Sequence, residues 1–214
     1  MAGYAVSTSG DTASMHLYRL DAPARAVAAA LGAEAGADPW AGGHVAPGQP
    51  APVITGNGQP GSRRHLRPKL WGVPPPPRGT QPVAHVRNLA SPFWIGTLRH
   101  PELRCLVPAT AFSGWTGPVG AKRQHWFYLP DRPIFAFAGI HRQGEDWPSF
   151  AILTTDPNRL VGRHATEAMP LILRAEDHDR WLTAEWRDAA QLVTPYPGQD
   201  MAVADTPQTQ KDSS

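Results

Sequence analysis

The sequence predicts a β-rich α+β domain, and three runs of residues carry this prediction. Residues 104–115, RCLVPATAFSGW, form two short apolar or aromatic segments that Pro108 divides. Residues 133–140, PIFAFAGI, and residues 149–157, SFAILTTDP, are apolar runs of β type bounded by Pro, Gly and Asp. Their spacing alone indicates four core strands and nothing more specific.

Helical and hairpin patterns complete the predicted elements in chain order. Residues 3–9 alternate enough to form a strand, and residues 21–35 predict a helix, with Asp21 as the cap and Gly36 after its end. Residues 122–129 pair with residues 133–140 as a predicted hairpin. Residues 175–186, AEDHDRWLTAEW, predict an amphipathic helix.

Length and composition set the remaining bounds. A chain of 214 residues with 41% hydrophobic residues and eight Trp is too apolar to be disordered throughout. One cysteine excludes an internal disulfide and fits a reducing compartment, so we expect a cytoplasmic protein. Residues 1–30 lack a signal-peptide pattern and no apolar run approaches about 18 residues, so no membrane partner is expected.

Charge is unevenly distributed along the chain. Residues 63–142 contain twelve Lys or Arg and two acids, a net charge of +10, whereas the whole chain carries +2. Tryptophans are interleaved with these bases, and this combination suits a polyanion with stackable bases. The alternative is that these basic residues, although close in the sequence, do not form a basic patch on the folded surface.

Several motifs in their order along the chain resemble the SRAP family. They are the Ala-Pro-x-Gln segment at residues 46–49, WGVP at 71–74, RCLVPA at 104–109, AFAGI at 136–140, LTT at 153–155 and MPLIL at 169–173. Proteins of this family bind single-stranded DNA at abasic sites and protect them by a covalent cross-link. The resemblance implies antiparallel sheets in a barrel-like core with a few flanking helices. We expect one domain over residues 1–197 and, because its composition is polar, a disordered tail over residues 198–214. We expect no cofactor or metal and a monomeric state.

The reactive N-terminus of the family is altered in this sequence. In the family, removal of the initiator Met exposes a Cys, whose α-amine condenses with the abasic aldehyde and whose thiol closes a thiazolidine. Here Ala2 takes the place of that Cys, and Tyr4 that of a following Arg. An Ala2 amine with a pKa of about 8 could form a reversible imine, but it has no sulfur to close the ring.

The other reactive positions of the family are also replaced. The resemblance places His85 on an Asn, Leu89 on a Glu and Gly114 on the acid/base Glu, with Thr166 on the catalytic His and Ala168 on an Arg. Only Arg87 keeps the family residue, which grips a phosphate. His85 and His164 are the candidates to replace the lost proton donors, and a surface position is the alternative for His164. The spacing His164-x-x-Glu167 is too weak to predict a metal site.

Candidate DNA contacts come from the basic half of the chain. Trp71 matches a loop whose aromatic residues wedge against bases in the family, although four prolines replace its second Trp. A core tryptophan is the alternative for Trp71. Further candidate contacts precede this loop or lie at the head of the predicted hairpin: Arg64, Arg67, Lys69, Lys122 and Arg123.

Three hypotheses remain open from the sequence. The first is a noncovalent binder of single-stranded or abasic DNA in the DNA damage (SOS) response, a pseudoenzyme with respect to cross-linking. The second is a weak abasic-site lyase that uses the Ala2 amine, with His85, His164 or Thr166 near its catalytic centre. The third is a repurposed scaffold that binds a protein or a small molecule.

Overall fold

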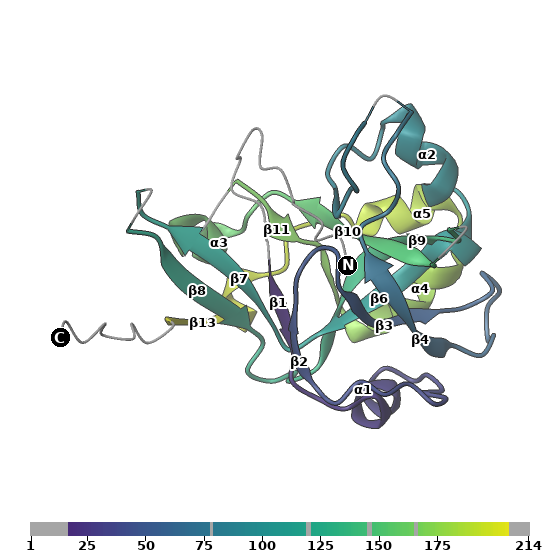
Figure 1. The fold of residues 1–214 in the computed structure, drawn as a ribbon, viewed down its shortest axis with the longest axis horizontal. Helices are drawn as coiled ribbons and strands as arrows, with labels where there is room; N and C mark the ends of the chain where they lie inside the picture. The colour runs from purple at the N-terminus through teal and green to yellow at the C-terminus, as the bar shows by residue number, and fades with distance from the viewer. Residues whose placement is uncertain (1–16, 78, 119–120, 145–146, 165–166, 206–214) are drawn as a thin grey trace, which may run out of the picture.

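Two β-sheets with short helices around them make up the structure (Figure 1). This computed structural model describes residues 17–77, 79–118, 121–144, 147–164 and 167–205. The expected strand at residues 3–9 lies outside these ranges, as do Ala2, Tyr4 and Thr166.

Five strands close into a barrel: β3 (Pro50–Thr55), β4 (His65–Trp71), β6 (Arg104–Ala109), β9 (Phe135–Arg142) and β10 (Ser149–Thr155). Four of the pairings, β4–β3, β3–β6, β6–β9 and β9–β10, are antiparallel. The ring closes through a parallel pairing of β10 with β4. The expected α+β fold with a barrel-like core is therefore confirmed.

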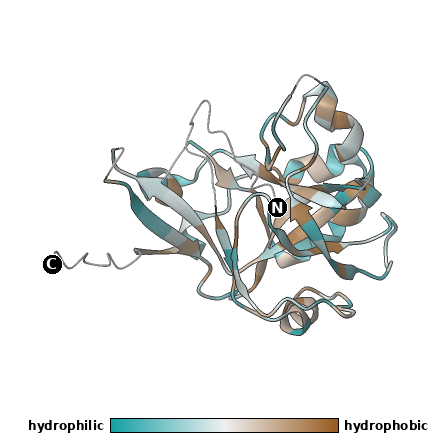
Figure 2. Ribbon diagram, in the orientation of Figure 1, coloured by the Kyte–Doolittle hydropathy of each residue, from teal (hydrophilic) through white to brown (hydrophobic). Residues whose placement is uncertain are grey.

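Bulky apolar side chains fill this barrel, and a helix covers its outside. Every residue of β6 and β10 is buried, because the inward face packs in the barrel and the outward face lies under other elements. Helix α4 (His178–Thr183) packs on β6, where the Trp181 indole donates to the Cys105 carbonyl at 3.0 Å. Figure 2 shows hydrophobic residues gathered on the barrel strands and the nearby helices.

A second, five-stranded sheet lies beside the barrel in the order β13-β8-β7-β1-β2. Its strands are β1 (Tyr18–Leu20), β2 (Gly43–Val45), β7 (Ala111–Thr116), β8 (Arg123–Tyr128) and β13 (Ala202–Asp205). The inner face of the sheet buries aromatic rings against the barrel. The Tyr18 ring, for example, meets those of Trp71 and Phe137 edge-on at 5.2 and 5.8 Å.

Short elements connect and cover the two sheets. The helices are α1 (Ala24–Ala30), α2 (Pro92–Leu98), α3 (Arg159–His164) and α5 (Trp186–Ala189), with 3₁₀ turns at Pro101–Leu103, Ala175–Asp177, Ala190–Leu192 and Gly198–Asp200. Two-residue strands β5 (His85–Val86), β11 (Met169–Pro170) and β12 (Ile172–Leu173) extend the barrel sheet.

The two predicted helices are shorter than expected. The N-terminal helix ends at Ala30 because Gly32 adopts a φ of 63°, which turns the chain out of the helix. The helix expected at residues 175–186 is divided, because Ala184 is extended with a ψ of 157° and ends α4.

Residues 198–205, which we expected in a disordered tail, are structured. Residues 202–205 form β13, which pairs antiparallel with β8 and extends the second sheet. The polar composition of this segment did not predict a strand. The pairing of β13 with β8 is made by backbone N–H and C=O groups, which every non-proline residue has, so it leaves no pattern in the side chains. Residues 206–214 lie outside the described ranges.

Candidate functional site

Arg87 and His85 lie together where β5 runs beside β10. His85 pairs with Ile152 in parallel register, so β5 lies along the C-terminal half of β10. Arg87 follows β5 directly and forms an ion pair with Asp156, which follows β10. Their side chains are 47% and 81% exposed, so this pair is well solvated. A partly exposed guanidinium with one weak surface partner is suited to an incoming phosphate.

Trp71 is a core residue and cannot stack on a base. It is fully buried, and its indole N–H donates to the Ala84 carbonyl at 2.9 Å. One edge of the ring meets His85, with 5.4 Å between centroids, and Phe150 stacks at 6.2 Å. The predicted base contact is therefore wrong, because the barrel and β1 enclose the indole. Its effect on the site is to support His85.

A second group of side chains forms on the inner face of the β7–β8 hairpin. Gly114 lies opposite His125, and the imidazole Nε2 of His125 is 2.7 Å from the Thr116 hydroxyl. The His164 ring meets the His125 ring at 5.4 Å and 67°. His164 Nδ1 donates to the Leu160 carbonyl at 3.1 Å, which orients its ring. The two imidazoles therefore lie side by side, and His125 is directly across the hairpin from Gly114.

The segment from Asp156 to His164 connects the two groups. It starts beside Arg87, continues into α3 and ends with His164 against His125. Figure 1 shows α3 next to β7 and β8, close to the end of β10 and β11. Sequence reasoning missed His125 as a member of this group. The alternation of β8, in which His125 shares a face with buried Phe127, was the available signal.

Two other replaced positions offer no reactive group. Leu89 is partly buried and packs against the hydrophobic core. Ala168 precedes β11 and is partly buried.

Lys69 and Cys105 belong to the barrel. Lys69 is only 7% exposed, and burial lowers the pKa of its ammonium, with an opposing contribution from Cys105. Lys69 is therefore not available to bind DNA, contrary to the prediction, because its strand position points it away from solvent. Burial raises the pKa of the Cys105 thiol to about 12, so this sulfur stays protonated and unreactive.

The remaining predicted DNA contacts are separated in space. Arg64 reaches the Leu31 carbonyl and Asp179, so it joins α1 to α4. That double engagement argues against the predicted DNA contact. Arg67 is exposed and donates to the Leu66 carbonyl. Lys122 and Arg123 are exposed where β7 turns into β8. The expected hairpin of residues 122–129 with residues 133–140 is wrong, because β8 pairs with β7 and β13, whereas β9 pairs with β6, β10 and β12 in the barrel sheet.

Acids from outside the basic segment neutralise much of its charge. Arg63 pairs with Glu34 at 3.3 Å, and Arg132 with Glu176 at 3.7 Å. Arg64 and Arg87 pair with Asp179 and Asp156. Arg104 is buried within β6. Part of the excess of +10 along the sequence is therefore paired with acids or buried.

The described part of the chain contains neither a cluster of metal-ligating side chains nor a helix that could cross a membrane. No three His, Cys, Asp or Glu side chains in those ranges are grouped to hold a metal ion. No described helix is long and apolar enough to cross a membrane.

The fold and the site define an α+β barrel protein with a histidine pair and a solvated arginine at the barrel rim. Residues 17–209 match the model of the SOS response associated peptidase (SRAP) family, and the chain belongs to this family. The matched range begins after residues 2 and 4. No curated protein was found to match the chain.

Solved structures support the same fold. A Bacteroides thetaiotaomicron protein superposes with a TM-score of 0.74 at 23% identity, covering 90% of this chain and 92% of its own. A Bordetella bronchiseptica protein gives 0.73 at 19% identity, with coverages of 89% and 99%. A phage-related protein of the same organism gives 0.72 at 18% identity, with coverages of 90% and 94%. At these identities the likeness concerns the fold.

Proposed function

We propose that this chain binds single-stranded DNA, including strands with abasic sites, without forming a thiazolidine cross-link. The position of the only cysteine in the sequence carries this proposal. The nitrogen of Cys105 lies in a peptide bond, so this residue has no free amine to condense with a sugar aldehyde and cannot close a thiazolidine. Cys105 is also fully buried in the barrel, and burial raises its pKa to about 12. Gly114 gives no carboxyl group beside the histidine pair. The chain therefore acts in the DNA damage (SOS) response as a binder.

Arg87 supplies the main support for a DNA contact. Its guanidinium lies at the rim of the barrel, next to the His85 strand, and its ion-pair partner within the described ranges is the exposed Asp156. A phosphate offers two oxygens to the forked donors of arginine and can replace such a solvated partner. Lys122 and Arg123, exposed at the hairpin head, add positive charge near the histidine pair.

A panel of oligonucleotides tests this proposal. Fluorescence anisotropy compares intact and abasic single strands with duplexes over a series of salt concentrations. Arg87→Ala should weaken binding to all single strands alike and reduce the salt slope by about 1. Arg99→Ala is the matched control, because Arg99 is also exposed but lies at the end of α2. Absence of single-strand binding at low salt would overturn the proposal.

Borohydride separates binding from imine chemistry. Trapping on an abasic oligonucleotide should give no covalent product if the chain only binds. A trapped band that disappears after acetylation of the N-terminal amine would instead establish the lyase that uses this amine.

A repurposed scaffold is the second candidate function. One observation favours it. Glu34 and Asp179, which lie outside the basic segment of residues 63–142, form ion pairs with Arg63 and Arg64 inside it. A pull-down that recovers only protein partners, together with no oligonucleotide binding, would support this function over the first.

A further inference from the structure

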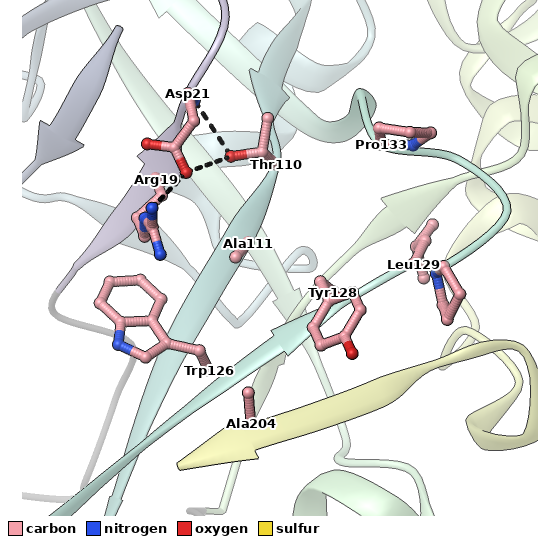
Figure 3. A pocket seen from close by; sticks show the side chains of 10 residues that line it. Arg19, Asp21, Thr110, Ala111, Trp126, Tyr128, Leu129, Pro133 and Ala204 are labelled. Carbon is pink, nitrogen blue, oxygen red and sulfur yellow. Dashed lines mark hydrogen bonds and ion pairs between the residues drawn. The ribbon is translucent and has the colours of Figure 1, made fainter. Parts of the chain in front are cut away.

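A hollow of about 620 Å³ lies on the outer face of the second sheet, away from the histidine pair. Figure 3 shows the rings of Trp126 and Tyr128 beside it, with Asp21 and Thr110 along another edge. Pro130 and Pro133 close its far end. We call it the outer-sheet hollow.

Strand register explains why these side chains meet. Arg19 lies opposite Ala111, and Trp126 lies opposite Ala204, so all four share one face of the sheet. The alternate residues of β8, such as buried Phe127, face the barrel. Small side chains at Ala111 and Ala204 leave space above the sheet between the larger rings.

A polar edge accompanies these aromatic walls. The Arg19 guanidinium lies 5.5 Å from the centroid of the Trp126 ring and 2.7 Å from Asp21. The Thr110 hydroxyl accepts from the Asp21 amide at 3.1 Å and donates to its carboxylate at 3.4 Å. The Tyr128 side chain remains 37% exposed, so part of its ring is accessible to a ligand.

We propose that the outer-sheet hollow binds a nucleobase of the single-stranded DNA, which rests on the proposed function. A base fits because it offers a flat π-face to Tyr128 and polar edges to Asp21, Thr110 and Arg19. Lys122 and Arg123 lie at the other end of β8 from Tyr128, where β7 turns into β8. Arg123 and Tyr128 lie five positions apart along this strand, a length of about 17 Å, so these bases would contact phosphates several nucleotides away from the base in the hollow.

A proline-rich peptide is the competing occupant, because such peptides also dock on Trp and Tyr. Peptides of this kind commonly add a basic residue that pairs with an acid. The charge of the acid in this hollow, Asp21, is already balanced by Arg19, so it attracts a basic side chain only weakly. The remaining lone pairs of the carboxylate and the remaining N–H groups of Arg19 can still bond to the edge of a neutral base. The available groups therefore favour a base over a basic, proline-rich peptide.

Tyr128 gives the cleanest test, because its exposure makes its substitution compatible with folding. Tyr128→Ala should weaken binding of a labelled 20-nucleotide oligothymidylate by about fivefold to a hundredfold, whereas Tyr128→Phe keeps the ring and should bind like the wild type. Trp147→Ala is the matched control, since Trp147 is 50% exposed and follows β9 rather than β8. Oligonucleotides with 4-thiothymidine should cross-link to the peptide that contains β8, as mass spectrometry can map.

The outcomes separate this inference from the proposed function. If Arg87→Ala weakens binding while Tyr128→Ala does not, the hollow is not a base site and the proposed function stands. If the wild type binds no single strand, both are overturned. Binding of a decaproline peptide that Tyr128→Ala abolishes, without any effect of Tyr128→Ala on oligothymidylate, would assign the hollow to a proline-rich partner.

Discussion

His178 makes acid stability a direct test of the packing around α4. It is the first residue of α4, and its imidazole is buried. Its pKa is lowered from 6.5 to about 4, chiefly by burial and also by nearby Arg64 and Arg132, against the opposing effects of Asp179 and Glu176. The native state therefore holds this histidine neutral, whereas the unfolded chain takes up the proton at a higher pH.

The sign and the size of the effect follow from this shift. Between pH 6.5 and about 4 the unfolded chain binds more protons, so the free energy of unfolding falls as the pH falls through this window. One pKa unit corresponds to about 1.4 kcal/mol, so the full shift makes a contribution on the order of 3–4 kcal/mol. This stability is fully present above pH 6.5 and absent below about pH 4.

Urea unfolding at a series of pH values measures the prediction. His178→Leu has a similar volume without a titrating group, so its free energy of unfolding should fall less steeply between pH 6.5 and 4 than that of the wild type. His44→Gln, at an exposed position of β2, controls for the loss of one histidine. Equal slopes for wild type and His178→Leu would refute the argument from burial.

Three further predictions concern the rim and the barrel. Asp156→Asn should release Arg87 and raise affinity for single-stranded DNA by about two- to fivefold in anisotropy, and a loss of affinity would contradict the phosphate assignment. Cys105 should react with a thiol reagent only as fast as the protein unfolds, so rapid reaction of the native protein would show that the thiol is accessible. Gly139→Ala should destabilise the fold by about 1–3 kcal/mol in urea unfolding, because an added Cβ would lie 2.9 Å from Cys105 Sγ, and an unchanged midpoint would count against this contact.

Local patterns predicted the barrel strands well, because apolar runs bounded by Pro, Gly and Asp form buried strands in most contexts. Residues 104–109, 135–142 and 149–155 all lie in barrel strands. The resemblance supplied the closed arrangement, which periodicity could not. The strand at residues 202–205 was missed, because its ladder uses backbone groups rather than an apolar pattern.

The candidate site was harder to predict, because exposure and pairing depend on distant residues. Trp71 and Lys69 were candidate DNA contacts, with a core position as the alternative for Trp71, and the barrel buries both. Arg64 was expected on DNA, but it meets Asp179, which lies 115 positions away in the sequence. His125 belongs to the candidate site because its ring contacts that of His164, and these two residues lie far apart in the sequence.

The sequence by itself determined the fold class, the family and the presence of only one cysteine, because these follow from local apolar patterns, motif order and composition. Tertiary structure alone decided which charges stay in solvent, which histidines meet and where that cysteine lies. Burial and ion pairing are set by segments that only folding brings together, so the chemistry of the rim could not be obtained from neighbouring residues in the chain.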